Sequence, residues 1–185
     1  MSNRSNRICP VEKADSLDTK TRRLFQNPRR ILKPYIKSGM AVLDFGCGPG
    51  FFTLDMARMV GPSGRVIAAD LQEGMLRIVR DKINGTELEN RIILHKCEPD
   101  KIGLTDNVDF ALLFYIVHEI PHKDKFFQEI AALLKPQGRA FIVEPPFHVN
   151  KQAFQTTLDK ARAAGLEITA SSNMFFKRHA LLIKV

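Results

Sequence analysis

The sequence has no tryptophan, only two tyrosines and only three cysteines among its 185 residues. Cys9, Cys47 and Cys97 are too few and too widely spaced for a disulfide framework, and no Cys-x-x-Cys pair offers a zinc site, so no metal is expected. No run of eighteen apolar residues exists, which excludes a membrane-spanning helix. The polar start of the chain, residues 1–7, has no apolar core of a secretion signal behind it. These absences favour a cytoplasmic chain in a reducing compartment.

The 44% share of hydrophobic residues is enough for one domain with a sizeable buried core. The net charge of +8 is concentrated at one end, because residues 1–40 carry a net +7 and residues 41–185 carry +1. We therefore expect a basic N-terminal helical segment, residues 1–39, that caps the substrate site, followed by the main domain, residues 40–185. The basic segment is either a solvated helix face or a lure for an anionic substrate or nucleic acid.

Apolar runs alternate with helical spacings along most of the chain. Helices are expected over residues 15–26 and from Pro28, which Asn27 would cap, to Gly39. The alternation then predicts strands at 41–45, 65–70, 91–97, 108–115 and 139–144, and helices around 51–60, 75–79, 126–134 and 154–161. Such alternation is typical of a doubly wound parallel sheet. Two last runs, 167–175 and 179–185, lie too close for a helix between them and should pair antiparallel.

A glycine-rich turn is the most informative stretch of the sequence. An apolar strand runs through Gly46-Cys47-Gly48-Pro49-Gly50 into a helix, and glycines let a ligand lie against bare backbone. Asp44 precedes this turn, and Asp70 ends the next strand, where a carboxylate can accept hydrogen bonds from a ribose diol. A dinucleotide fingerprint would need a glycine where Phe51 stands. The turn therefore favours a nucleoside ligand without a diphosphate and with an amino-acid end.

In this order of strand, acid, glycine turn, helix, strand and acid, the chain resembles class I S-adenosylmethionine-dependent methyltransferases. The similarity is to the small methyltransferase-domain type found in ubiquinone/menaquinone and arsenite methyltransferases. It covers about residues 30–185, and the segments 42–53, 66–76, 109–120 and 133–145 carry it. The resemblance implies an α/β, Rossmann-like doubly wound sheet of seven strands in the order 3-2-1-4-5-7-6, with strand 7 antiparallel. It also implies S-adenosyl-L-methionine as the cofactor.

The same resemblance assigns the cofactor-binding residues: Asp44, Gly46, Cys47, Gly48, Asp70, Leu71, Met75, Glu98 and Phe114. The glycine turn would lie under the cofactor, with the preceding acid near its methionine end. Asp70 would bind the ribose hydroxyls, and Leu71 and Met75 would contact the adenine, although plain core packing is the alternative for these two. Glu98 takes the place of the acid that bonds the adenine amino group. Pro99 follows it, and a proline has no N–H to donate to the ring.

Catalysis by a sulfonium methyl donor depends mainly on positioning, and a general base is needed only where the acceptor keeps its proton. The catalytic candidates are Tyr115 and His118, which follow the fourth strand. Glu119, Glu144 and His148 are further candidates nearby in the chain. A structural role is the alternative for His118, since a lone histidine has many uses besides proton transfer.

Several acceptor classes lack their sequence marks. No Asn/Asp-Pro-Pro-Tyr/Phe follows the fourth strand, which argues against methylation of amino groups on bases, and no cysteine follows the fourth or fifth strand, which argues against cytosine C5 chemistry. Arsenite methylation would need a thiolate cluster that three cysteines do not supply. We therefore expect methyl transfer to a small-molecule acceptor by in-line displacement. The alternatives are an RNA-directed methyltransferase that uses the basic segment and a non-catalytic nucleotide-binding protein.

Overall fold

The computed structural model describes residues 10–174 and 177–185. Arg4 and Arg7 of the basic segment, and Cys9, lie outside the described residues. In chain order the elements are η2 (Val11–Lys13), α1 (Ala14–Leu17), α2 (Lys20–Phe25), α3 (Pro28–Leu32), β1 (Ala41–Phe45), α4 (Thr53–Val60), β2 (Arg65–Asp70), α5 (Glu73–Ile83), η3 (Glu89–Arg91), β3 (Ile92–Lys96), β4 (Val108–Phe114), η4 (Val117–Glu119), α6 (Lys123–Leu133), β5 (Leu134–Glu144), α7 (Lys151–Ala163), β6 (Leu166–Met174) and β7 (Lys177–Lys184).

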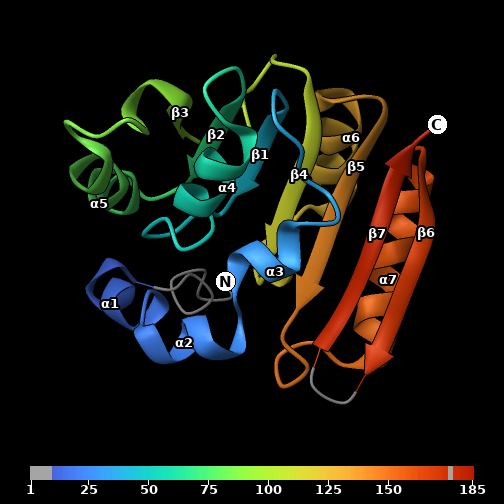
Figure 1. The fold of residues 1–185 in the computed structure, drawn as a ribbon. Helices are drawn as coiled ribbons and strands as arrows, with labels where there is room; N and C mark the ends of the chain where they lie inside the picture. The colour runs from blue at the N-terminus through green and yellow to red at the C-terminus, as the bar shows by residue number, and fades with distance from the viewer. Residues whose placement is uncertain (1–9, 175–176) are drawn as a thin grey trace.

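The seven strands form a single sheet in the order β3-β2-β1-β4-β5-β7-β6 (Figure 1). Neighbouring strands from β3 to β5 run parallel, whereas β7 runs antiparallel to both β5 and β6. The predicted strand order and the antiparallel seventh strand are therefore confirmed. Because the order reverses between β1 and β4, a crevice is expected outside the carboxyl ends of these two strands.

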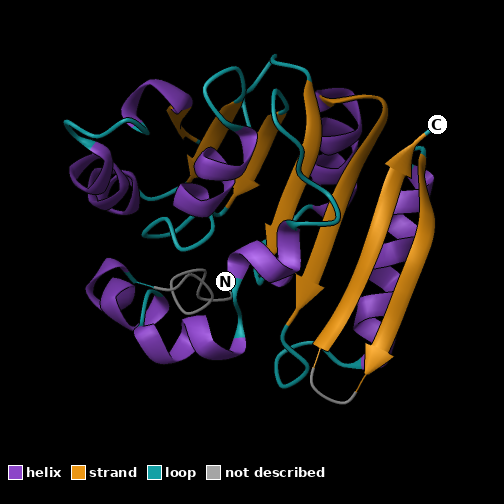
Figure 2. Ribbon diagram, viewed as in Figure 1, coloured by secondary structure: helices purple, strands orange, loops and turns teal. Residues whose placement is uncertain are grey.

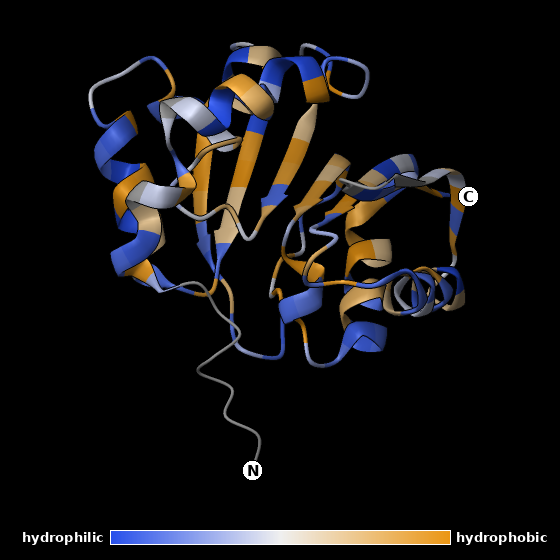
Figure 3. Cartoon of the chain, turned by 90° about the horizontal axis from the view of Figure 1, so that it is seen from below, coloured by the Kyte–Doolittle hydropathy of each residue, from blue (hydrophilic) through white to orange (hydrophobic). Residues whose placement is uncertain are grey.

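Helices cover both faces of the sheet (Figure 2). One buried cluster joins α6 and α7 to β1, β4 and β5, and a second joins α3, α4 and α5 to the opposite face. All five residues of β1 are buried, as a strand covered on both sides requires. Figure 3 shows the same division, with mostly hydrophobic strands between helices that alternate hydrophobic and hydrophilic residues.

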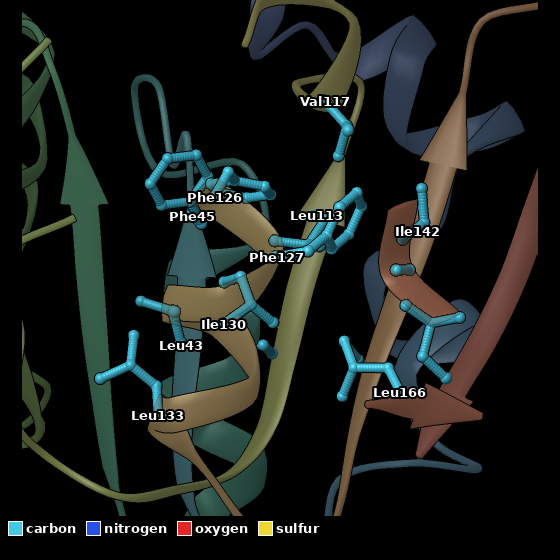
Figure 4. Close-up of a cluster of buried hydrophobic side chains, with 14 of the residues drawn as sticks. Leu43, Phe45, Leu113, Val117, Phe126, Phe127, Ile130, Leu133, Ile142 and Leu166 are labelled. Carbon is cyan, nitrogen blue, oxygen red and sulfur yellow. The ribbon is translucent and has the colours of Figure 1, made fainter. Parts of the chain in front are cut away.

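Helix α6 forms the centre of one of these clusters (Figure 4). Phe126, Phe127 and Ile130 are each 5% exposed or less, and their spacing puts them on the helix face that meets β1 and β4. The ring of Phe126 lies 4.9 Å from the ring of Phe45, at the end of β1. The core therefore holds the carboxyl end of β1 firmly, directly before the glycine turn.

Several element boundaries differ from the sequence prediction. The helix expected from Pro28 to Gly39 ends already at Leu32. The helix expected over residues 15–26 is divided into α1 and α2, because Thr19 leaves the helical conformation and its hydroxyl accepts a hydrogen bond from the Arg22 backbone N–H at 3.1 Å. Strand β5 begins at Leu134 rather than at residue 139, because Leu134 already pairs with Val108. The ladder shifts register beyond that pair, and Gln137, with φ +64°, takes a left-handed conformation within the shift.

The N-terminal segment has two structural parts. Leu32 of α3 and Ile36 are buried in the core cluster that contains α4. In contrast, α1 and α2 lie beyond the carboxyl ends of the parallel strands (Figure 1). A cap formed by residues 1–39 stays a prediction, and α1 and α2 are the helices placed to act as one. Within the part of the chain that the structure describes, no helix has the length and apolar character needed to cross a bilayer.

Candidate functional site

The glycine turn after β1 is tied to the neighbouring strand by its backbone. The N–H groups of Gly46 and Cys47 donate to the Ala69 carbonyl of β2 at 2.8 and 3.1 Å. Gly46 has φ +70°, and a Cβ built there would lie 2.5 Å from Cγ1 of Ile116. Only glycine therefore fits this position, which lets the chain turn sharply between the ends of β1 and β4.

A cavity of about 580 Å³ lies at the carboxyl ends of β1, β2 and β4. Its volume is in the usual range for small-molecule and cofactor sites. Its lining comes from the glycine turn, from the ends of these strands, from the loop around Glu98, from η4 and from helices α1 and α2. This is the crevice that the reversal of strand order predicts.

Asp70 is held in one orientation at the end of β2. The carboxylate is 8% exposed, and its Oδ2 and Oδ1 accept hydrogen bonds from the backbone N–H groups of Gly48 and Gln72, at 2.9 and 2.8 Å. Burial raises the pKa of this carboxyl, while the backbone N–H groups of Gln72, Gly48 and Leu71 oppose the rise. An ionised carboxylate has about four acceptor sites, so the fixed group keeps acceptor capacity for a hydroxyl in the cavity.

Asp44, within β1, is a second buried carboxylate beside the turn. It is 3% exposed, and its Oδ2 accepts a hydrogen bond of 2.6 Å from the Thr53 hydroxyl at the start of α4. Burial, together with the negative charge of Asp70, raises the pKa of Asp44 to about 6. The floor of the cavity thus carries two acidic groups that lack a basic side-chain hydrogen-bond partner among the described residues.

All the residues predicted to bind the cofactor line this cavity: Asp44, Gly46, Cys47, Gly48, Asp70, Leu71, Met75, Glu98 and Phe114. Met75 is 2% exposed and Glu98 is exposed at the rim. Burial raises the pKa of the Cys47 thiol well above its usual value, so this thiol is a packed apolar group. The structure brings these residues together, and their individual roles in binding stay predictions.

Of the two catalytic candidates, only Tyr115 is among the residues that line the cavity. Tyr115 has φ +59°, and its hydroxyl accepts a hydrogen bond of 3.1 Å from Gln26 Nε2. His118 is not among the residues that line the cavity. Its Nδ1 lies 2.6 Å from Oε2 of Glu144, which is 1% exposed, and its ring centroid lies 5.6 Å from that of His148. A catalytic role for either residue stays a prediction.

Glu119, next to His118 on η4, does line the cavity. Burial raises the pKa of Glu119 to about 7, and the charges of Asp70 and Glu144 add to the rise, while His118 opposes it. A carboxyl group in this state exchanges protons near neutral pH, which suits a general acid or base.

Four residues at the site have no mark in the sequence that predicted them: Arg22, Gln26, Phe51 and Ile116. All but Gln26 line the cavity, and Gln26 contacts it through Tyr115. The positive charge of the N-terminal segment indicated only that one of its basic residues could contact an anionic ligand, and it did not single out Arg22. No spacing or motif marks the others, because their partners are distant in the chain.

Residues 36–174 match the sequence profile of a methyltransferase domain family. The match covers well over half of the chain. The chain belongs to this methyltransferase domain family. The predicted resemblance to class I S-adenosylmethionine-dependent methyltransferases is therefore confirmed, as are its Rossmann-like fold and S-adenosyl-L-methionine as the cofactor of such enzymes.

Relatives and solved structures agree with this assignment. The ubiquinone/menaquinone biosynthesis C-methyltransferase of Pseudomonas paraeruginosa is 32% identical over 110 residues, which are 59% of this chain and 43% of the relative. The demethylmenaquinone methyltransferase of Lactobacillus johnsonii is 34% identical over 110 residues, which are 59% of this chain and 45% of the relative. The chain thus spans less than half the length of these relatives. A SAM-dependent methyltransferase from Aquifex aeolicus is 29% identical with a TM-score of 0.85, covering 96% of this chain and 100% of that one.

The residues of this methyltransferase domain fit S-adenosyl-L-methionine. A Cβ at Gly46 would clash with Ile116, so the turn leaves its backbone bare beside the cavity. The buried Asp70 carboxylate has the acceptor capacity that a ribose diol needs. Apolar side chains, among them Ile116, Ile120 and Phe126, line the same cavity.

Proposed function

We propose that this chain transfers a methyl group from S-adenosyl-L-methionine to a small, predominantly apolar acceptor. One observation carries the proposal: a single cavity is lined by a polar set, the bare glycine turn and the fixed Asp70 carboxylate, and by an apolar set that includes Ile116, Ile120 and Phe126. The first set suits a polar nucleoside and the second an apolar molecule.

When bound, the cofactor supplies a methyl group activated by a sulfonium charge to a nucleophile in line with the breaking bond. The chain itself binds and orients. Asp70 holds hydroxyl groups at the end of β2, and Ile116 and Ile120 present apolar surface that keeps water from the acceptor. In this proposal Glu119, whose pKa is raised to about 7, removes a proton from the acceptor, and Tyr115 positions the acceptor.

The relatives' names support an acceptor of the quinone-precursor type. Both named relatives methylate intermediates of quinone biosynthesis, as their names state. A ring with hydroxyl groups would match an apolar wall with a few polar groups, which here are Glu119 and Tyr115. We extend this substrate class to the present chain as part of the proposal.

RNA is the less favoured acceptor. Two arginines of the basic segment already have a buried acidic partner, since Arg23 and Arg29 both pair with Asp55, at 2.8 and 3.1 Å. Charges committed to an internal carboxylate contribute less to phosphate binding. Binding to RNA that weakens steeply with added salt would favour this alternative instead.

Calorimetry with S-adenosyl-L-methionine tests the cofactor part of the proposal. We expect binding, and we expect Asp70→Ala to weaken it by about 1.5–3 kcal/mol, the cost of losing hydrogen bonds to a charged acceptor. The matched control is Asp106→Ala, because Asp106 is a surface carboxylate paired with Arg65 away from the cavity. No heat and no thermal shift at millimolar ligand would contradict the proposal.

The acceptor is tested separately. The chain is incubated with a methyl-labelled donor and a metabolite extract, and the products are identified by mass spectrometry. A demethylated quinol with a short side chain and a structured RNA serve as defined acceptors. Label in the quinol or another apolar metabolite supports the proposal, whereas label only in RNA contradicts it.

A further inference from the structure

Arg22, on α2, places its guanidinium in the wall of the cavity. The Cζ atom lies 4.1 Å from the ring centroid of Phe51 and 6.0 Å from that of Phe114. Its Nε donates to Gln26 Oε1 at 3.0 Å, and one terminal nitrogen donates to the Leu17 carbonyl. The side chain is thus stacked on an aromatic ring and held by two hydrogen bonds, and no described residue bonds to its second terminal nitrogen.

This cation lacks the carboxylate partner that its neighbours have. Arg23 pairs with Asp18 and Asp55, and Arg29 pairs with Asp55. Among the described residues, no carboxylate lies within ion-pair distance of Arg22. Burial lowers the pKa of Arg22, which shows that the surroundings solvate its charge poorly. A partly buried charge without a counter-ion is costly, so the position suits an anionic ligand that supplies one.

The cavity also indicates which anion fits. Arg22 interacts electrostatically with Tyr115, Asp18 and Asp44, and of the two acids only the buried Asp44 is among the residues that line the cavity with Arg22. A group placed between Arg22 and Asp44 meets a cation on one side and a carboxylate on the other. A zwitterionic α-amino acid has the complementary arrangement, with its carboxylate toward the arginine and its ammonium toward the acid. An apolar acceptor has neither charge.

We propose that Arg22 binds the carboxylate of the amino-acid tail of S-adenosyl-L-methionine and thereby fixes α2 over the cavity, an inference that rests on the proposed function. Within the protein, a series of hydrogen bonds starts at Arg22. Arg22 Nε bonds to Gln26, and Gln26 bonds to the hydroxyl of Tyr115 at the end of β4. The tail therefore links the N-terminal helices to the side of the cavity where the acceptor is expected.

Two ligands test this assignment by calorimetry: S-adenosylhomocysteine, which has the amino-acid tail, and 5′-methylthioadenosine, which lacks it. Arg22→Met keeps an apolar chain over Phe51 but removes the charge. It should weaken S-adenosylhomocysteine binding by about 10- to 100-fold, as expected for losing charged hydrogen bonds, and leave methylthioadenosine unchanged. Arg22→Lys should recover part of the loss. Arg30→Met, an exposed arginine on α3, is the matched control and should alter neither ligand.

The results separate the two proposals. If the wild-type chain binds neither ligand, the cofactor proposal fails. If it binds both and the ratio of the two affinities is the same in wild type, Arg22→Met and Arg22→Lys, only the role of Arg22 is wrong. Should Arg22→Met fail to fold, the affinity ratio in Arg22→Lys decides.

Hydrogen exchange of the wild-type chain tests the second half of the inference. S-adenosylhomocysteine should slow amide exchange in α2, and methylthioadenosine should not. Equal protection by the two ligands would show that the tail does not fix the helix.

Discussion

Gln26 donates a hydrogen bond of 3.1 Å to the hydroxyl of Tyr115, which lies 89 residues further along the chain. This bond joins the N-terminal segment to the end of β4. Tyr115 has φ +59°, an uncommon conformation for a residue other than glycine, and its backbone N–H is held by the Val143 carbonyl at 2.8 Å. Residues kept in such conformations tend to occur at functional sites, which is consistent with the position of Tyr115 in the cavity wall.

A double-mutant cycle measures how strongly this bond holds the N-terminal segment to the end of β4. Gln26→Ala and Tyr115→Phe should each lower the free energy of unfolding, and their coupling energy should be about 0.5–1.5 kcal/mol, as for a neutral hydrogen bond. The bond between Gln26 and Arg22 does not enter the coupling, because it is lost whether or not the tyrosine is changed. Urea unfolding of the four proteins gives the values. Additive effects would show that other contacts hold the N-terminal segment in place.

Gly46 and Gly85 form a matched pair for testing the glycine turn. Both have positive φ, +70° and +68°, but a Cβ would meet Ile116 at Gly46 and nothing within 4 Å at Gly85. Gly85→Ala should cost about 1 kcal/mol of stability through backbone strain alone. Gly46→Ala should cost a further 1–3 kcal/mol, roughly the penalty for overpacking, and should weaken cofactor binding. Equal losses in urea unfolding would mean that Ile116 moves aside without cost.

Local patterns allowed most of the fold to be predicted from the sequence. The glycine turn, with Asp44 before it and Asp70 at the end of the next strand, is a contiguous sequence signal for a strand–turn–helix unit. The continuous apolar runs gave the strands, because a strand covered on both faces cannot alternate. The antiparallel pairing of the last two strands followed from the short connection between them.

The rest of the site depends on contacts that no local pattern encodes. Arg22 reaches Phe51, and Gln26 reaches Tyr115, only because α2 lies across the ends of the strands. His118 and Glu119 are adjacent in the sequence and both can exchange protons. Which one faces the cavity depends on the rotation of the short helix η4, and three residues are too few to show a periodicity.

Asp44 should lower the stability of the ligand-free protein at neutral pH. Burial raises its pKa from 3.8 to about 6, so the unfolded state releases the proton first as pH rises, and stability falls across this interval. Asp44→Asn should therefore stabilise the fold by about 2–3 kcal/mol at pH 7. Asparagine can still accept the hydrogen bond from Thr53.

Thermal unfolding as a function of pH checks this expectation. The stabilising effect of Asp44→Asn should disappear near pH 3.5, roughly below both pKa values, where the aspartate is neutral in the folded and the unfolded state. The same variant should bind S-adenosyl-L-methionine more weakly, since it loses the charge facing the cavity. A variant that is no more stable at pH 7 would show that the carboxylate is better solvated than its burial indicates.

Glu119 should give methyl transfer its dependence on pH. Only the deprotonated carboxylate can accept a proton, and the pKa of Glu119 is raised to about 7, so turnover should rise between about pH 6 and 8 and then level off. Glu119→Gln should remove this rise and lower kcat by about 10²- to 10⁴-fold, the range for loss of a general base, with cofactor affinity retained. His118→Gln is the matched comparison, because its amide can still donate to the buried Glu144. If His118→Gln instead abolishes the rise while Glu119→Gln keeps it, His118 is the base. The imidazole would then have to reach the acceptor from outside the residues that now line the cavity.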